Sequence, residues 1–249
     1  MTALHALAIF AAGIAAGTIN TVVGSGTLIT FPTLLALGYT PLVANVSNTI
    51  GLVPGTASGA IGYRHELAGQ RARIVPLALC SATGGIVGAV LLLSLPADAF
   101  NDIVPFFIAA ALVLIVGQRW ISRLLGGHKR GAHETAGFGA AVGVFVSGIY
   151  GGYFGAAQGI LVLAILGLTV DDELHRLNAT KVVLAGLVNL ISGIIFIFAA
   201  HVSWPAAGLI AGGSLLGGVL GARYGRRLPP SALRAVIVIV GVIAIVRLL

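Results

Sequence analysis

Charged side chains are scarce in this chain of 249 residues, where Asp, Glu, Lys and Arg together make up 8% of the positions. An ordinary soluble domain has about 25%. The hydrophobic residues reach 58%, and the mean hydropathy is +1.06. A soluble domain cannot hide so much apolar surface while it presents so few charges to water. The composition therefore excludes an ordinary soluble protein and predicts an integral membrane protein that lies in the lipid bilayer.

Cysteine is nearly absent as well. The single cysteine, Cys80, excludes an internal disulfide and a cysteine-based metal cluster. His128 and His133 lie in a basic segment without a carboxylate or thiolate cluster, so we expect no metal and no cofactor. Ser25 lacks the upstream glycine of a G-x-S-G nucleophile motif, and no histidine is singled out by its spacing. We therefore predict no catalytic residue and do not expect an enzyme.

The basic residues exceed the acidic ones and give a net charge of +7. In a soluble chain this surplus would indicate nucleic acid as a partner. Here the basic residues gather in three loops between apolar segments, and loops rich in Lys and Arg stay on the cytoplasmic side. The three groups are Arg64, Arg71 and Arg73; Arg119, Arg123, Lys129 and Arg130; and Arg223, Arg226, Arg227 and Arg234. The charge therefore indicates orientation, and we expect no nucleic-acid partner.

Six apolar segments are long enough to cross a bilayer, which takes about 20 residues. They are residues 41–61, 74–95, 103–120, 179–200, 206–222 and 232–249. Two further regions, 3–37 and 136–168, are apolar but broken by glycine clusters, and the limb after each break has only about a dozen residues, too few to cross. Each broken region is either a kinked span plus a short helix or a re-entrant hairpin that enters and leaves on one side.

The basic loops distinguish these two readings. The second and third basic loops both lie on the cytoplasmic side, so the chain between them must cross the membrane an even number of times. Two full spans already lie between these loops, and the broken region 136–168 must therefore contribute an even number of crossings as well. A re-entrant hairpin contributes none and satisfies this condition, whereas one kinked span does not. Each half then contains one hairpin and three crossings. We predict two repeats of inverted topology, residues 1–121 and 136–249, joined by a basic cytoplasmic linker, 122–135, with both termini outside.

Similarity between the halves supports this duplication. The matching segments are Leu37-Gly38-Tyr39-Thr40 with Leu166-Gly167-Leu168-Thr169, Asn45-Val46-Ser47-Asn48 with Asn178-Ala179-Thr180-Lys181, and Gly84 and Gly88 with Gly213 and Gly217. Each match alone is weak, but their common order and nearly constant offset indicate an internal repeat.

Inverted repeats with broken helices are typical of secondary transporters, which bind substrate where the helix ends meet. A helix that begins at such a break points N–H groups and a positive dipole end toward it, which favours an anion. The candidate residues at the two hairpin tips are Asn20, Gly24, Ser25, Gly26 and Thr27, and Tyr150, Gly152, Tyr153 and Gln158. Close helix packing is the alternative role for the glycines.

A second candidate group lies at the start of the helix that follows each hairpin: Asn45, Ser47 and Asn48, and Asn178, Thr180 and Lys181. Residues three apart share a helix face, so Asn45 with Asn48 and Asn178 with Lys181 form polar pairs. Helix capping is the alternative role for the two asparagines at 45 and 178. Lys181 contacts substrate or extends to the cytoplasmic surface.

All seven acidic residues are expected in loops. They are Glu66, Asp98, Asp102, Glu134, Asp171, Asp172 and Glu173. Their absence from the spans removes the usual carboxylate proton relay. A basic interior without acids suits a small anion better than a cation.

A ladder of glycines, Gly213, Gly217, Gly221 and Gly225, with Gly84 and Gly88, provides faces for close helix contact. These faces pack inside the fold or form a homodimer interface.

The first half resembles the signature of the sulfite exporter TauE/SafE family of permeases. The segments that carry this likeness are Ala16-Gly17, Gly24-Ser25-Gly26, Phe31-Pro32-Thr33-Leu34, Gly38, Pro41 and Ala44-Asn45-Val46-Ser47-Asn48. The second half resembles its weaker second copy at Gly151-Gly152, Gly155, Gly159, Leu166-Gly167 and Asn178-Ala179-Thr180. Ser25, Thr27 and the segment from Ala156 to Gln158 depart from the family's glycine pattern.

The resemblance implies a permease for small sulfur-containing anions, such as sulfite or organosulfonates. We therefore expect an all-helical, multi-pass protein of the cytoplasmic membrane that binds a small anion between its hairpin tips and transports it by alternating access. An anion channel and a membrane-embedded binding or scaffold protein are the alternatives. A scaffold has no need for polar residues such as Asn20, Ser25 and Lys181 in its interior.

Overall fold

The computed structural model describes residues 1–125, 137–225, 235, 237–240 and 242, and each regular element within them is a helix. The helices are α1 (Ala3–Val22), α2 (Thr27–Ala36), α3 (Pro41–Gly62), α4 (Arg64–Leu67), α5 (Arg71–Ser94), α6 (Ala97–Leu125), α7 (Phe138–Tyr153), α8 (Gln158–Thr169), α9 (Leu174–Ala199) and α10 (Trp204–Tyr224). The prediction of an all-helical protein is confirmed.

Five of these helices are long and apolar enough to cross a membrane, namely α1, α5, residues Ala99–Gly117 of α6, α9 and α10. Helix α3 has 22 residues but is not among them. Its polar side chains, Asn45, Ser47 and Asn48, lower its hydropathy, and all three are buried. The polar side chains of α3 thus lie inside the bundle. The expected span at 232–249 lies largely outside the described residues.

The region around α6 differs from the prediction. Asp98 and Asp102 were expected in a loop, but they lie in the first turns of α6, because that helix already begins at Ala97. Asp102 lies within the candidate span Ala99–Gly117, so the prediction that all acidic residues lie outside the spans is wrong at this position. The side chain of Asp102 is exposed. Glu66, also expected in a loop, lies in the one-turn helix α4. Helix α6 continues to Leu125, into the expected linker, and residues 126–135 lie outside the described part of the chain.

Both glycine clusters end a helix, as the sequence predicts. Helix α1 stops before Gly24, which has a φ of +90°, and α2 starts three residues later. Helix α7 stops before Gly155, at φ +75°, and α8 starts after Ala157, at φ +60°. A left-handed alanine costs roughly 1–2 kcal/mol, and such strain is concentrated at functional sites. Helix α1, at 20 residues, is long enough to cross alone, whereas α7 has 16.

The first limb of each hairpin packs against a helix of the other half. Helix α1 lies along α10, where a Cβ on Gly213 would lie 2.9 Å from the backbone nitrogen of Ile14. Helix α7 lies along α5, where a Cβ on Gly84 would lie 3.0 Å from the Cα of Gly148. Small residues thus allow close backbone contact in both places. The glycines at 84, 88, 213, 217 and 221 are used inside the chain.

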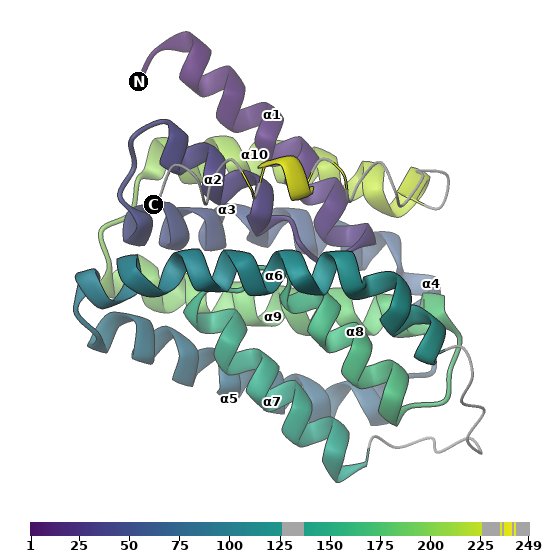
Figure 1. Ribbon diagram of the computed structural model, residues 1–249. Helices are drawn as coiled ribbons and strands as arrows, with labels where there is room; N and C mark the ends of the chain where they lie inside the picture. The colour runs from purple at the N-terminus through teal and green to yellow at the C-terminus, as the bar shows by residue number, and fades with distance from the viewer. Residues whose placement is uncertain (126–136, 226–234, 236, 241, 243–249) are drawn as a thin grey trace.

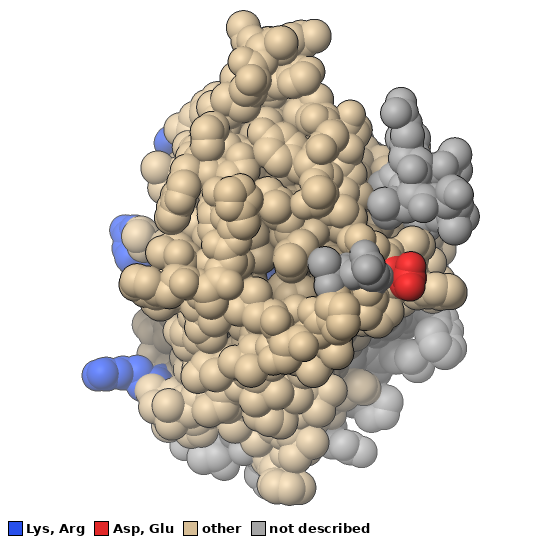
Figure 2. Space-filling view, turned by 90° about the vertical axis from the view of Figure 1, so that its left-hand side faces the viewer, with Lys and Arg blue, Asp and Glu red and all other residues tan. Residues whose placement is uncertain are grey.

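The loops that connect the helices lie at two opposite ends of the molecule (Figure 1). The loops between α2 and α3, α5 and α6, and α9 and α10 lie on the left of the view, whereas α4 and the loop from α8 to α9 lie on the right. Figure 2 shows the left-hand face, which is almost free of charged side chains. Arg64, Arg71 and Arg73 belong to the opposite end, at α4 and the start of α5.

Candidate functional site

The two hairpin tips meet at Gly24 and Gly159. The N–H of Gly159 donates to the carbonyl oxygen of Gly24 at 3.0 Å. A Cβ on Gly24 would lie 2.6 Å from the Cα of Gly159, and a Cβ on Gly159 would lie 2.5 Å from the Cα of Gly24. A side chain at either position would collide with backbone, so both positions need glycine. We call this contact between Gly24 and Gly159 the hairpin crossing. The tips that the sequence singled out therefore come together.

Two helices begin beside this crossing. Helix α2 follows Gly26 and α8 follows Ala157, and no side chain caps either helix at its N-cap residue. Ser25 is 1% exposed and Gln158 is 3% exposed. Ser25 Oγ and Gln158 Nε2 have no hydrogen-bond partner among the described residues. Two helix N-termini and two buried, unpartnered donors give this place the character of an anion site.

The polar pair of α3 contacts both hairpins. Asn45 Nδ2 donates to the carbonyl oxygen of Tyr153, at the end of α7, at 3.0 Å. Asn48 Nδ2 donates to Thr27 Oγ1 at 3.2 Å, and Thr30 Oγ1 donates to Asn48 Oδ1. Asn45 is not a helix cap, because Thr40 is the N-cap residue of α3. Its side chain instead ties α3 to the break in the second hairpin.

The polar pair of α9 contacts the end of α1. Asn178 Nδ2 donates to the carbonyl oxygen of Thr21 at 3.4 Å. Lys181 Nζ donates to the carbonyl oxygens of Asn20 and Thr21 at 3.4 and 3.3 Å. Glu173 is the N-cap residue of α9, so Asn178 is not a cap either. Both side chains hold the carbonyl end of α1, just before the first hairpin tip.

Lys181 is 1% exposed and does not reach the surface. Within the described residues it has no carboxylate within ion-pair distance, and its bonds go to neutral carbonyl groups. An unpaired charge in a low-dielectric interior is expensive and marks a functional site by default. The site therefore contains one buried cation without an acidic partner.

Four predicted residues take part in other contacts. Ser47 Oγ accepts from the N–H of Ser203 at 2.9 Å, in the loop before α10. Tyr150 donates its hydroxyl to the Ala156 carbonyl at 2.6 Å, within its own hairpin. A Cβ on Gly152 would lie 3.0 Å from the backbone nitrogen of Ala89, so Gly152 serves helix packing. Thr180 donates to Gln70 Oε1 at 3.0 Å, away from the tips.

The remaining predicted residues lie around the crossing. They are Asn20, Gly24, Ser25, Gly26, Thr27, Asn45, Asn48, Tyr153, Gln158, Asn178 and Lys181. Asn20 Oδ1 accepts from the N–H of Gly26 at 3.5 Å, across the first break. The ring of Tyr153 packs edge-on against Phe100 and Phe107, with centroids 5.7 Å apart in both pairs.

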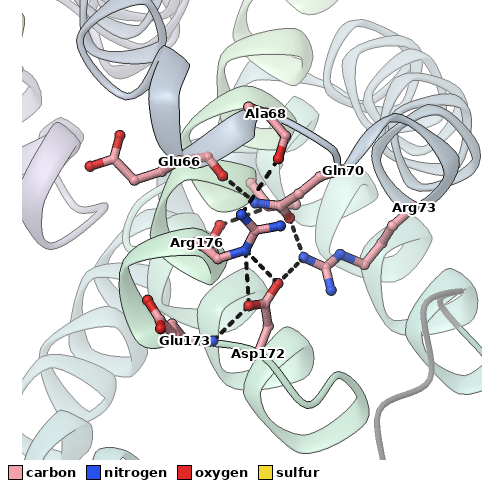
Figure 3. Close-up of polar contacts among 8 residues, drawn as sticks. Glu66, Ala68, Gln70, Arg73, Asp172, Glu173 and Arg176 are labelled. Atoms are coloured by element: carbon pink, nitrogen blue, oxygen red, sulfur yellow. Dashed lines mark hydrogen bonds and ion pairs between the residues drawn. The ribbon is translucent and has the colours of Figure 1, made fainter.

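A separate polar group lies beside α4 and the start of α5 (Figure 3). We name it the junction cluster: Gln70, Arg73, Asp172, Arg176 and Thr180. Asp172 pairs with Arg73, and it pairs with Arg176 at 3.0 Å. Arg73 also donates to Gln70 Oε1, and Arg176 donates to the Ala68 carbonyl at 3.4 Å. The cluster joins the start of α5 to the start of α9, and so one half to the other.

The Asp172 carboxyl lies in the loop before α9, and two effects on it oppose each other. Partial burial raises its pKa, whereas hydrogen bonds from Arg73, from the N–H of Glu173 and from Arg176 lower it. The hydrogen bonds prevail and hold the pKa of Asp172 below its usual value. Asp172 thus remains ionised at neutral pH as the centre of the cluster.

Sequence reasoning missed Thr21, Thr30 and, apart from Thr180, the junction cluster. Thr21 acts through its backbone carbonyl, which no side-chain pattern can indicate. Thr30 lies three residues after Thr27, so the same-face spacing of α2 is the signal that would have found it. Arg73 and Asp172 are 99 residues apart, and each looked like an ordinary loop charge.

Comparison with known proteins gives matches along nearly the whole chain. The family model described as "Sulfite exporter TauE/SafE" matches residues 9–248. The "Probable membrane transporter protein ORF9" of Sinorhizobium sp is 29% identical, over 99% of this chain and 94% of that protein. The "Probable membrane transporter protein" of Haemophilus influenzae is 26% identical, over 93% and 89%, and the "Probable membrane transporter protein YfcA" of Escherichia coli K12 is 28% identical, over 97% and 88%. No solved structure matches the chain significantly.

Proposed function

We propose that this multi-pass membrane protein, which belongs to the sulfite exporter TauE/SafE family, is a secondary transporter that carries a small anion across the cytoplasmic membrane. The observation that carries the proposal is the buried ammonium group of Lys181, which lies beside the hairpin crossing without an acidic partner. A bound anion would supply the missing counter-charge.

The crossing adds to this preference for an anion. Helices α2 and α8 direct their N-termini toward it, and Ser25 and Gln158 offer buried donors without partners. No acidic residue occurs in α1, α2, α3, α7 or α8. A cation placed here would meet the Lys181 charge and no carboxylate, which is unfavourable.

A sulfur oxyanion, such as sulfite or an organosulfonate, is the substrate class we propose. Its support is the family to which the chain belongs, which is named for a sulfite exporter. The related proteins are described as membrane transporters without a named substrate. The donor set is compatible with this class, because hydroxyl, amide and ammonium groups all bond to the oxygens of an oxyanion.

Alternating access supplies the mechanism. The two hairpins come from different halves and contact each other at two glycines, so movement of one half would open the crossing toward one side. The junction cluster ties the halves together at the end that carries Arg64 and Arg71, and the positive-inside rule assigns this end to the cytoplasm. We propose that this end is closed here, and that both chain termini lie outside.

Flux into proteoliposomes tests the function. The purified protein is reconstituted, and uptake of radiolabelled sulfite and of methanesulfonate is compared with uptake of sodium ion. We expect saturable uptake of at least one sulfur anion and none of sodium. Uptake that rises linearly with concentration would indicate a channel, and absence of uptake for every sulfur anion would refute the substrate class.

A variant pair tests the site. Lys181→Gln should lower anion uptake about 30-fold or more, as expected when one partner of a buried charge pair is removed. Arg71→Gln is the matched control, because it removes a cation that is exposed, and its uptake should stay within about twofold of wild type. Equal uptake by the Lys181 variant and the wild type would remove Lys181 from the site.

A further inference from the structure

The charge count at the hairpin crossing limits the charge of the substrate. Helices α1, α2, α3, α7 and α8 contain no Lys, Arg, Asp or Glu. On α9, Arg176 pairs with Asp172, and Lys181 remains as the charged group beside the tips. The buried cation on α5, Arg73, lies in the junction cluster and shares the Asp172 carboxylate with Arg176, so that separate cluster keeps a net charge of +1. Among the described residues, the site thus presents a single positive charge.

We propose that the site selects a singly charged oxyanion over a doubly charged one. This inference rests on the proposed function, namely that an anion binds at the crossing. A monoanion neutralises Lys181 and leaves the occupied site without net charge. A dianion leaves one uncompensated negative charge in a low-dielectric interior, because Lys181 is the one cation beside the hairpin tips in the described part of the chain.

The donors near the tips match the head group of a sulfonate. The Lys181 ammonium has three N–H bonds and donates two of them to the carbonyls of Asn20 and Thr21, so one remains. Ser25 contributes a hydroxyl and Gln158 an amide N–H, both buried and without a partner among the described residues. These donors, with one charge among them, suit the oxygens of an anion that carries one negative charge.

Methanesulfonate and sulfate test this selection. Both ions are tetrahedral at sulfur and similar in size, but methanesulfonate has a methyl group in place of the fourth oxygen of sulfate and carries one unit of charge less. Binding of each sodium salt to the purified wild-type protein is measured by titration calorimetry in detergent at pH 7 and equal ionic strength. We expect methanesulfonate to bind at least 10-fold more tightly than sulfate.

Equal binding of the two ions, or tighter binding of sulfate, would overturn the inference while leaving an anion site in place. Binding of neither ion, together with absence of sulfite flux, would refute the proposed function itself. The two failures are therefore distinguishable.

Two variants at position 181 connect the preference to its cause. Lys181→Arg keeps the positive charge and should keep the preference for methanesulfonate, even if both affinities fall. Lys181→Gln removes the charge and should bring the ratio of the two affinities to within about twofold. A purely structural role for Lys181 would lower both affinities together and leave their ratio unchanged. A preference that persists in the glutamine variant would thus exclude Lys181 as its origin.

Discussion

The polar pairs on α3 and α9 occupy matching positions but differ in charge. In the first half the pair is Asn45 and Asn48, and in the second half it is Asn178 and Lys181. Both asparagines donate to a backbone carbonyl at the end of the first limb of the opposite hairpin, Tyr153 in one case and Thr21 in the other. The fourth residue differs, because Asn48 bonds to hydroxyl groups of α2 whereas Lys181 carries a charge.

This difference separates two roles of the polar pairs, a neutral contact that both pairs make and a charge that only one pair carries. The shared asparagine contacts hold each hairpin break against the helix of the other half, and they require only neutral groups. The lysine adds a charge on one side of the crossing alone. We infer that the asparagine contacts play the same structural role in both halves, whereas the affinity for an anion comes from the half that contains α9.

The contact between the halves at the crossing should show the largest effect on stability. Gly24→Ala introduces a Cβ that would lie 2.6 Å from the Gly159 backbone, at a residue with positive φ. We expect a loss of about 2–5 kcal/mol in the free energy of unfolding, from backbone strain and overpacking together. Thermal unfolding of the purified protein in detergent measures the loss.

Gly38→Ala is the matched control for this change. Gly38 also has a positive φ, of +88°, but a Cβ there would meet nothing within 4 Å. It should therefore lose only the strain, about 1–2 kcal/mol. Equal losses of stability in the two variants would show that the two hairpins do not contact each other at Gly24.

The junction cluster should show the next largest effect. Asp172→Asn leaves Arg73, which is 6% exposed, without its ionised partner. We expect a loss of about 1–3 kcal/mol in the free energy of unfolding at pH 7. Glu173→Gln in the same loop is the control, because only its backbone N–H contributes to the cluster in the described contacts.

The same variant gives a pH dependence with a definite sign. Because the pKa of Asp172 is lower in the folded protein than its usual value of about 4, its stabilising effect is complete at higher pH. The effect is lost as the pH falls through the folded pKa, below about 4. The difference in melting temperature between wild type and Asp172→Asn should thus shrink between pH 6 and pH 3. A difference that stays constant over this range would contradict the ion-pair role.

The sequence allowed much of the fold to be predicted, because composition and glycine placement act locally. The glycine clusters end α1 and α7 where expected, and the expected spans 74–95 and 179–200 correspond to α5 (Arg71–Ser94) and α9 (Leu174–Ala199). The start of α6 was missed, because Asp98 and Asp102 look like loop residues although they occupy the first helical turns.

The partners within the site were less predictable, because they depend on how the helices are rotated and paired. Lys181 and Thr180 are neighbours in sequence but point to different faces of α9, one toward the end of α1 and the other toward Gln70. Neighbouring helical residues are about 100° apart around the axis, so only the position of the partner helix decides which one enters the site. The carbonyls that receive Lys181 belong to the backbone and leave no trace in residue type.

The smallest expected effect on stability tests whether the two asparagine contacts play the same role in both halves. Asn45→Ala and Asn178→Ala each remove one amide donor to a carbonyl at a hairpin break, at 3.0 and 3.4 Å. We expect each to lower the free energy of unfolding by about 1 kcal/mol, the usual contribution of such a hydrogen bond.

Anion affinity should separate the two variants further, because Thr21 accepts from both Asn178 and Lys181. Asn178→Ala removes a donor to the Thr21 carbonyl, which also binds the Lys181 ammonium, and should therefore weaken methanesulfonate binding. Asn45→Ala affects only the uncharged pair on α3 and should weaken this binding less. Calorimetry on both purified variants measures the two affinities. If Asn45→Ala weakened methanesulfonate binding as much as Asn178→Ala, both halves would contribute equally to the anion affinity, and Lys181 would not be its main source.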